Sequence, residues 1–135
     1  MPRPTPRCRC DTGRKRSRCC GPILAGRLAK TPLELMRSRY TAYALGDVDH
    51  IIETTARDGP HWREDQDAWQ DAIERSIESA VFQKLTILDA PEPVGDEGKV
   101  SFEVRVKVGG VSDVTGEHPR FVLRDGVWLY WGAQS

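Results

Sequence analysis

Residues 31–46 read TPLELMRSRYTAYALG, and they carry the signals of a complete helix. Thr31 is a capping residue, Pro32 suits the first helical position, and Glu34 is placed to complete a capping box. Apolar and aromatic side chains then recur at helical spacing, at Leu33, Met36, Tyr40, Tyr43 and Ala44. Because Gly46 suits the left-handed residue that ends many helices, the stretch predicts a helix that stops there and has one apolar face.

Two shorter helices are predicted after Gly46. Asp47 is placed to cap the first of them, with Val48, Ile51 and Ile52 directed inward, and Gly59-Pro60 then breaks the chain. The second covers about residues 67 to 81. Its apolar stripe consists of Trp69, Ala72, Ile73, Ile77 and Ala80.

From Phe82 onward the apolar period changes to two, which is typical of strands. A first strand begins near Leu85 and Ile87, and residues 90–98 form a polar loop. Between residues 100 and 108, valine and phenylalanine alternate with polar residues, so this strand has one dry and one wet face.

The last third of the chain predicts a further hairpin. Gly109-Gly110 turns the chain into a loop that runs to Glu117, and Asp125-Gly126 joins strands at 121–124 and 127–132. Three helices followed by an antiparallel sheet predict an α+β domain. With 135 residues and 39% hydrophobic content, the chain can bury one core and not two.

All four cysteines lie within the first twenty residues, as Cys8, Cys10, Cys19 and Cys20, in the pattern C-x-C-x8-C-C. Thiolates are soft ligands that suit a tetrahedral zinc ion, and two close pairs on a short loop can converge on one ion. Gly13 and Gly21 stand where the chain must bend sharply, and glycine accepts the positive φ angles of such bends. The pattern therefore predicts a structural zinc site.

Two other interpretations of the cysteines remain open. Two disulfides would fit the even count, but they belong to oxidising compartments, and nothing at this N-terminus resembles an export signal. A redox pair at Cys19 and Cys20 would benefit from the surrounding arginines, although the usual C-x-x-C motif is absent.

Three stretches resemble one bacterial family. Residues 8–22, CRCDTGRKRSRCCGP, are similar to the SEC-C zinc motif, and residues 35–47, LMRSRYTAYALGD, resemble the most recognisable stretch of the YchJ-like proteins. Residues 121–130, FVLRDGVWLY, are similar to the last hairpin of that family. The resemblance implies a cytoplasmic protein with a SEC-C-like zinc knuckle, residues 1–25, on a cone-like nuclear transport factor two-like (NTF2-like) domain, residues 31–135. It implies no particular activity.

Charge is divided unevenly along the chain. Residues 1–30 carry nine basic residues against one acidic residue, Asp11, whereas residues 31–135 carry eleven basic residues against nineteen acidic ones. The knuckle loop holds the candidate partner-binding residues Arg14, Lys15, Arg16 and Arg18, since clustered bases bind phosphates and other anionic surfaces. Alternatively, these bases offset the net charge of about −2 on a zinc ion with four thiolates.

An interaction module is the function that the sequence favours. SEC-C-like knuckles resemble the C-terminal motif of the secretion ATPase SecA, which docks a partner protein. We therefore expect a protein or RNA partner, the ribosome included, at the basic knuckle, and we expect a homodimer through the sheet as a further possibility of the fold. No apolar run approaches the roughly 18 residues of a membrane span, so a membrane location is not expected.

The alternative is a small-molecule-binding protein or an isomerase-type or hydratase-type enzyme, with a pocket between the helices and the sheet. The candidate pocket residues are Tyr40, Tyr43, Trp69, Trp128 and Tyr130. His50, Trp62 and His118 are further polar or aromatic candidates, but no two histidines share metal-ligand spacing, and none stands beside a nucleophile. The enzymatic alternative therefore rests on analogy of fold.

Overall fold

The computed structural model describes residues 7–133, so residues 1–6 and 134–135 of the two predicted units lie outside the described residues. The helical elements are η1 (Arg16–Arg18), α1 (Cys20–Leu24), α2 (Pro32–Leu45), α3 (Val48–Glu53) and α4 (Gln66–Glu78). The strands are β1 (Ala80–Asp89), β2 (Glu97–Lys99), β3 (Ser101–Val108), β4 (Val111–Glu117), β5 (Pro119–Arg124) and β6 (Val127–Ala133). None of the helices formed within residues 7–133 has the length and hydropathy needed to cross a bilayer.

The signals that predicted α2 act in the structure almost as expected. Thr31 Oγ1 accepts a hydrogen bond from the Glu34 amide at 3.1 Å, and Gly46 ends the helix with φ +82°. The Glu34 carboxylate does not close a capping box, because Oε1 instead accepts from the Lys30 amide at 3.3 Å and from Arg27 at 2.9 Å. The first turn of α2 is therefore fixed at Glu34, which bonds to Thr31 at the cap and to Arg27 and Lys30 before it.

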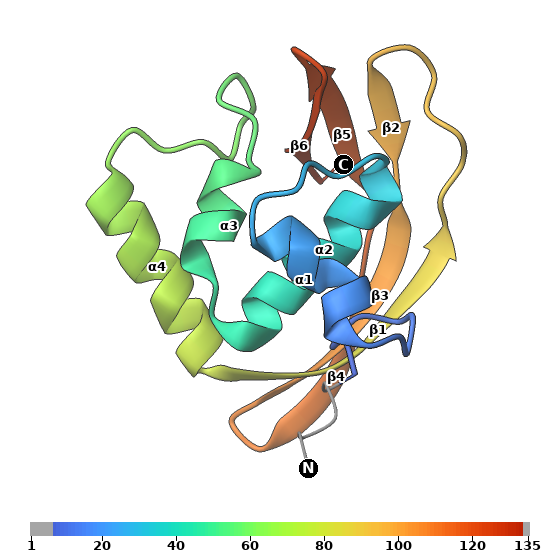
Figure 1. Ribbon diagram of the computed structural model, residues 1–135. Coiled ribbons are helices and arrows are strands. Elements are labelled where there is room, and N and C mark those ends of the chain that lie inside the picture. Colours follow the sequence, from blue (N-terminus) through green and yellow to red (C-terminus); the bar gives the residue numbers. More distant parts are fainter. Residues whose placement is uncertain (1–6, 134–135) are drawn as a thin grey trace.

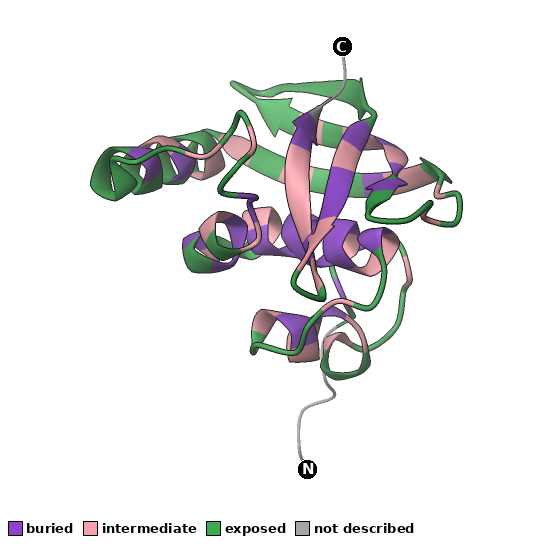
Figure 2. Cartoon of the chain, turned by 90° about the horizontal axis from the view of Figure 1, so that it is seen from above, coloured by how far each residue is buried: buried purple, intermediate pink, exposed green. Residues whose placement is uncertain are grey.

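Helix α2 is the centre of the molecule, between α1 on one side and the sheet on the other (Figures 1 and 2). The prediction of a single apolar face is wrong, because the polar residues Ser38, Arg39 and Thr41 are as buried as Met36 and Tyr40. Helix α2 is covered on three sides: α1 packs on its outer side, α3 along its flank, and β1 and β6 on its inner side. Buried polar side chains need hydrogen-bond partners, and Ser38 finds them in the Leu35 carbonyl of the same helix and in His50 of α3.

The described residues form two three-stranded antiparallel sheets, in the strand orders β1-β3-β4 and β2-β5-β6. Strands β2 and β3 are separated only by the fully buried Val100, whose amide bonds to the carbonyl of Pro119 at 3.4 Å, so one nearly continuous segment runs through both sheets. The two sheets thus make one bent surface behind the helices (Figure 1). This confirms the predicted mixture of helices on a bent antiparallel sheet.

Strand β4 corrects the predicted loop before Glu117. Its seven residues pair with β3 from Val108 opposite Val111 to Phe102 opposite Glu117, and all of them are exposed. An exposed edge strand is held by backbone pairing alone, so its side chains need not alternate between apolar and polar.

Asp125 and Gly126 form the predicted hairpin turn between β5 and β6, with φ angles of +51° and +77°.

The cysteine segment shares the core of the domain. Cys8, Cys10 and Cys20 are buried in one cluster with side chains of α2 and the sheet, namely Leu35, Met36, Tyr40, Leu85, Val100, Phe102, Phe121 and Trp128. A second cluster, formed by Ala42, Val48, Ile51, Trp69 and Ile73, joins α2 to α3 and α4. The described part of the knuckle is therefore packed into the domain and is not an exposed appendage.

Candidate functional site

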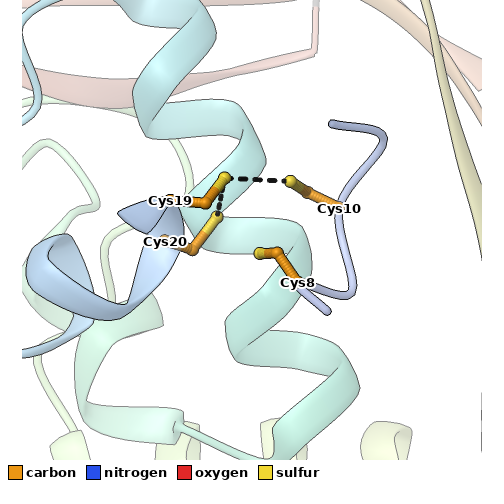
Figure 3. Close-up of side chains that lie close together, drawn as sticks. All are labelled: Cys8, Cys10, Cys19 and Cys20. Carbon is orange, nitrogen blue, oxygen red and sulfur yellow. Dashed lines mark hydrogen bonds between the residues drawn. The ribbon is translucent and has the colours of Figure 1, made fainter. Parts of the chain in front are cut away.

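The four cysteine sulfurs converge on one point beside α2 (Figure 3). All four Sγ atoms lie within 4.8 Å of one another, with 3.5 Å between Cys10 and Cys19 and 3.9 Å between Cys19 and Cys20. A tetrahedral ion bound at a Zn–S distance of about 2.3 Å would hold its sulfurs about 3.8 Å apart. The spacing and the donor atoms therefore fit a metal ion of this kind.

The geometry does not fit two disulfides. All four cysteines are free, and the sulfur separations are far longer than the roughly 2.05 Å of a disulfide bond. Cys8 and Cys10 come from the segment before η1, Cys19 follows η1, and Cys20 begins α1. The two pairs are thus presented by two different pieces of local structure.

Two glycines shape the loop between these pairs, for different reasons. Gly13 has φ +69°, as the sequence predicts, and the turn around it is closed by a 2.7 Å hydrogen bond from the Cys8 amide to the Arg14 carbonyl. Gly21 does not have a positive φ. A Cβ at Gly21 would lie 2.6 Å from the carbonyl oxygen of Arg16, so glycine is needed there for close backbone approach.

Two threonine hydroxyls contact the sulfurs. Thr41, fully buried on α2, lies 3.6 Å from Cys8 Sγ and donates to Cys20 Sγ at 3.4 Å. Thr12 Oγ1 lies 3.1 Å from Cys19 Sγ and 3.4 Å from Cys10 Sγ. Each hydroxyl therefore serves one sulfur from each half of the C-x-C-x8-C-C pattern, in the manner of groups that orient metal ligands.

The sulfurs influence each other strongly. Hydrogen bonding from the Cys20 thiol lowers the pKa of Cys10 to about 4, against the opposing effect of burial, and Thr12 lowers it further. The same contact with Cys10, together with burial, raises the pKa of Cys20, and burial raises the pKa of Cys19. Four neighbouring thiols cannot all ionise unless a cation compensates their negative charges. A bound metal ion would supply that positive charge.

Polar contacts tie the cysteine loop to the domain. Arg37 of α2 binds Asp11 through both carboxylate oxygens, at 2.6 and 3.1 Å, and Arg9 donates to the carbonyl of Phe82 on β1 at 2.9 Å. The pKa of Arg37 is raised, first by Asp11 and further by Cys10 and Cys19. Arg37 is therefore a positive charge that interacts favourably with negative charge on the sulfurs. The sequence suggested this compensating role for the bases of the knuckle loop instead.

Three of the four candidate partner-binding residues are exposed. Arg14, Lys15 and Arg18 face solvent, and none of them forms an ion pair with a carboxylate of residues 7–133. Arg16 is half-buried, and its Nε atom is buried with no hydrogen-bond partner in the described part of the chain. The loop therefore presents a surface of three basic residues, Arg14, Lys15 and Arg18, which we call the basic loop.

A cavity of about 450 Å³ lies between α2 and the sheet. Four of the five candidate pocket residues line it, namely Tyr40, Tyr43, Trp69 and Tyr130. Trp128 is absent from the lining and packs in the core cluster that includes the cysteines. It shares a strand face with Tyr130 but stands two residues closer to the hairpin turn, a displacement of about 7 Å along the strand.

The other polar candidates lie outside this cavity. His50 is buried on α3 and bonds to Ser38 Oγ at 2.9 Å, and His118 is exposed and lies 2.9 Å from Ser101 Oγ. Trp62 stacks edge-to-face on Trp69 and lines a second, shallow depression near Arg124. The structure thus brings four aromatic candidates together in the cavity and leaves Trp62, Trp128 and these two histidines outside it.

Comparison with known proteins places this geometry in a family. The family model described as YchJ, middle NTF2-like domain, matches residues 31–133. The chain belongs to the YchJ-like family. A UPF0225 protein of Pectobacterium carotovorum subsp. carotovorum is 35% identical over 130 residues, which cover 91% of this chain and 79% of that protein.

Two solved structures share this fold. A SEC-C motif containing protein from Rhodopseudomonas palustris has a TM-score of 0.80 and 34% identity, and the match covers 96% of this chain and 98% of that one. A SEC-C motif containing protein from Psychrobacter arcticus has a TM-score of 0.72 at 22% identity, over 96% of this chain and 82% of that one. The second likeness concerns the fold alone.

Sequence reasoning missed the polar residues of α2 that serve these sites in the YchJ-like chain. Thr41 contacts the sulfurs, and Arg39 lines the cavity. Both stand between residues predicted as core, and nothing in helical spacing distinguishes a buried threonine or arginine from an exposed one. The one available signal was the run Arg37-Ser38-Arg39, polar residues within a segment that otherwise reads as apolar.

The Thr41 hydroxyl offers a test of the candidate metal site in this YchJ-like chain. We expect Thr41→Val to weaken zinc binding about 10-fold to 100-fold, because the isosteric methyl group cannot donate a hydrogen bond to Cys20 Sγ. Competition with a chromogenic chelator measures the zinc affinity. Thr86→Val, at a half-buried position of β1, is the matched control, and an equal affinity in the two variants would show that the hydroxyl does not support the ion.

Proposed function

We propose that this YchJ-like protein is a zinc-binding interaction module, in which four cysteine thiolates hold a zinc ion and the basic loop docks an anionic partner. The observation that carries the first half is the convergence of four free cysteine sulfurs within 4.8 Å of one another. Thiolate-only sites with tetrahedral spacing are typical of structural zinc rather than of the harder ions Mg²⁺ and Ca²⁺. The zinc ion would then have a structural role, because all four ligand positions are filled by protein.

The docking half of the proposal is supported by where the bases lie. The metal centre fixes both ends of the loop, since Cys10 precedes it and Cys19 ends it, and the basic loop faces outward between them. The partner is expected to be an anionic macromolecule, either RNA, including that of the ribosome, or an acidic protein surface. A loop fixed by metal loses little conformational entropy on binding, which favours affinity.

Charge removal tests the docking. We expect the triple variant Arg14→Ala, Lys15→Ala, Arg18→Ala to lose at least about tenfold of the RNA or protein captured from cell extract, because three phosphate or carboxylate contacts disappear. The capture is measured as bound RNA and bound protein separately, with and without ribonuclease, which identifies the class of partner.

The control must remove the same charge elsewhere. The triple variant Lys84→Ala, Arg105→Ala, Lys107→Ala removes three exposed bases from β1 and β3. Capture that falls equally in both triple variants would indicate a general charge effect, and capture unchanged in the basic-loop variant would reject docking through this loop.

Two further expectations complete the proposal. A cytoplasmic location is proposed because free thiolates persist in reducing compartments, and fractionation of the native organism measures it.

Pairing of two chains through the sheet is proposed from the exposed edge strand β4. This strand carries Val111 and Val114 on its surface, and sedimentation of the purified protein measures the pairing.

A further inference from the structure

The cavity between α2 and the sheet is largely apolar but contains one buried charge. Most of its wall consists of aliphatic and aromatic side chains, among them Met36, Tyr40, Phe82, Phe102 and Val104. Phe82 packs against both Tyr40 and Tyr43, with ring centroids 6.0 and 5.8 Å apart. A volume of about 450 Å³ with such a lining is typical of sites for small organic molecules.

The buried charge belongs to Arg39, which is 4% exposed. Its Nη1 atom donates to the Ile51 carbonyl at 2.9 Å, to Thr54 Oγ1 at 2.7 Å and to Thr55 Oγ1 at 3.3 Å. Its guanidinium carbon lies 4.2 Å from the centre of the Tyr130 ring. These three hydrogen bonds all involve Nη1, Tyr43 is a further polar neighbour of the guanidinium, and no carboxylate of residues 7–133 forms an ion pair with Arg39.

This arrangement leaves a positive charge without compensation. The guanidinium group stays protonated in proteins, and all three of its acceptors are neutral. A buried charge without a counter-charge is costly, and proteins normally pair it. The one acidic residue in the lining, Glu117, is exposed on β4 and forms no ion pair with Arg39 within residues 7–133. Burial lowers the pKa of Arg39, and the charge of Glu117 opposes that lowering without cancelling it.

The remaining polar groups of the cavity also favour an anion. His61 and Arg63 add basic character to the lining, which is otherwise apolar. Burial raises the pKa of Tyr130 to about 12, so its hydroxyl keeps its proton and can donate a hydrogen bond. A guanidinium edge and a phenol hydroxyl facing one apolar space are suited to a carboxylate group attached to a hydrophobic body.

We propose that this cavity binds a small organic carboxylate, which places its anionic group against Nε and Nη2 of Arg39 and its apolar part against Met36 and Phe82. The site is separate from the metal centre and from the basic loop, so it adds a ligand to the proposed interaction module. The buried charge of Arg39 and the apolar, largely aromatic walls determine this class of ligand. A neutral molecule of the same shape would leave the charge of Arg39 uncompensated.

The test compares two probes of equal shape, cinnamate and cinnamamide, which differ in charge. The chain has two methionines, so labelled methionine methyl groups give a simple spectrum in which the Met36 signal, assigned by Met36→Leu, reports on the cavity. We expect cinnamate to shift the Met36 signal and to bind at least tenfold more tightly than cinnamamide. Equal affinities, or no shift of the Met36 signal with cinnamate, would overturn the proposal.

A variant distinguishes an anion anchor from a purely structural arginine. Arg39→Met keeps the volume and removes the charge, so the preference for cinnamate should fall to about one while weak binding of both probes remains. Arg124→Met, which removes an exposed arginine paired with Asp58 away from the cavity, is the control and should keep the preference. Because Arg39 also holds the end of α3, circular dichroism checks that Arg39→Met is folded. If that variant does not fold, the ratio of the two affinities in the unaltered protein decides the question.

Discussion

Removal of zinc is expected to destabilise the whole chain and not only its first 25 residues. Cys8, Cys10 and Cys20 belong to the same core cluster as Leu35 and Trp128, so losing the ion opens the outer side of α2 as well. Binding to structural zinc contributes roughly 10 to 16 kcal/mol in small zinc peptides. For a domain that retains a second core cluster, we expect a loss of unfolding free energy of roughly 5 kcal/mol on chelation, measured by urea denaturation with and without chelator.

Ligand substitution checks the same centre without a chelator. Cys8→Ser and Cys19→Ser should each reduce zinc from about one per chain to well below stoichiometry in elemental analysis, because a hydroxyl is a poor replacement for a thiolate. Ser17→Ala, at an exposed position of the same loop, should keep its zinc. Full zinc content in either cysteine variant would reject the four-cysteine site.

Denaturation distinguishes local unfolding of the cysteine segment from destabilisation of the whole domain. If the near-ultraviolet signal of the aromatic residues and the urea midpoint were both unchanged on chelation, only the cysteine segment would depend on the ion, and the shared core would contribute little. A loss of both is the result that the packing around α2 predicts.

Acid is expected to weaken the fold through one histidine. His50 is 7% exposed, and burial lowers its pKa to about 4 from 6.5, with a smaller lowering by Arg39 opposed by Asp47. Ser38 donates its own proton to the Leu35 carbonyl, so the Nε2–H group of His50 donates to Ser38 Oγ. The folded protein therefore holds His50 in its neutral form.

The sign of the effect follows from that preference. Because the unfolded chain binds the His50 proton more readily, the stabilisation is complete above about pH 6.5 and is lost as the pH falls toward about 4. The shift corresponds to about 3 kcal/mol. Urea denaturation at several pH values measures this loss, and it should be much smaller in His50→Gln than in the control His118→Gln, whose histidine is exposed. An identical pH dependence in both variants would show that other groups cause it.

The elements found from the sequence are those whose signals are local. A capping threonine, an N-terminal proline and a C-terminal glycine bracket α2, and the hairpin at Asp125-Gly126 needs only its two turn residues. Strand β4 escaped prediction because backbone pairing with β3 holds it, and such pairing leaves no pattern in the side chains. The cysteines were recognisable by chemistry, because four thiolates in so short a segment are a typical set of soft metal ligands.

Burial set the limit of prediction at the functional sites. Helical spacing identifies one apolar stripe, but α2 is covered on three sides, and its covering elements are remote in sequence. Thr41 meets sulfurs 21 and 33 residues before it, and Arg39 reaches carbonyl and hydroxyl groups 12 to 16 residues after it. Their roles depend on which elements pack against the helix, and that information does not reside in the residues around them.

Arg39 and Thr41 are two residues apart on one rigid helix, with the cavity on one side of it and the sulfurs on the other. A change in the packing of this helix would reach both places, so we expect the two proposed occupancies to be linked thermodynamically. Such linkage is reciprocal: if the ion tightened binding of the small molecule by some factor, the small molecule would tighten binding of the ion by the same factor. A shortage of either one would then weaken the binding of the other to this protein.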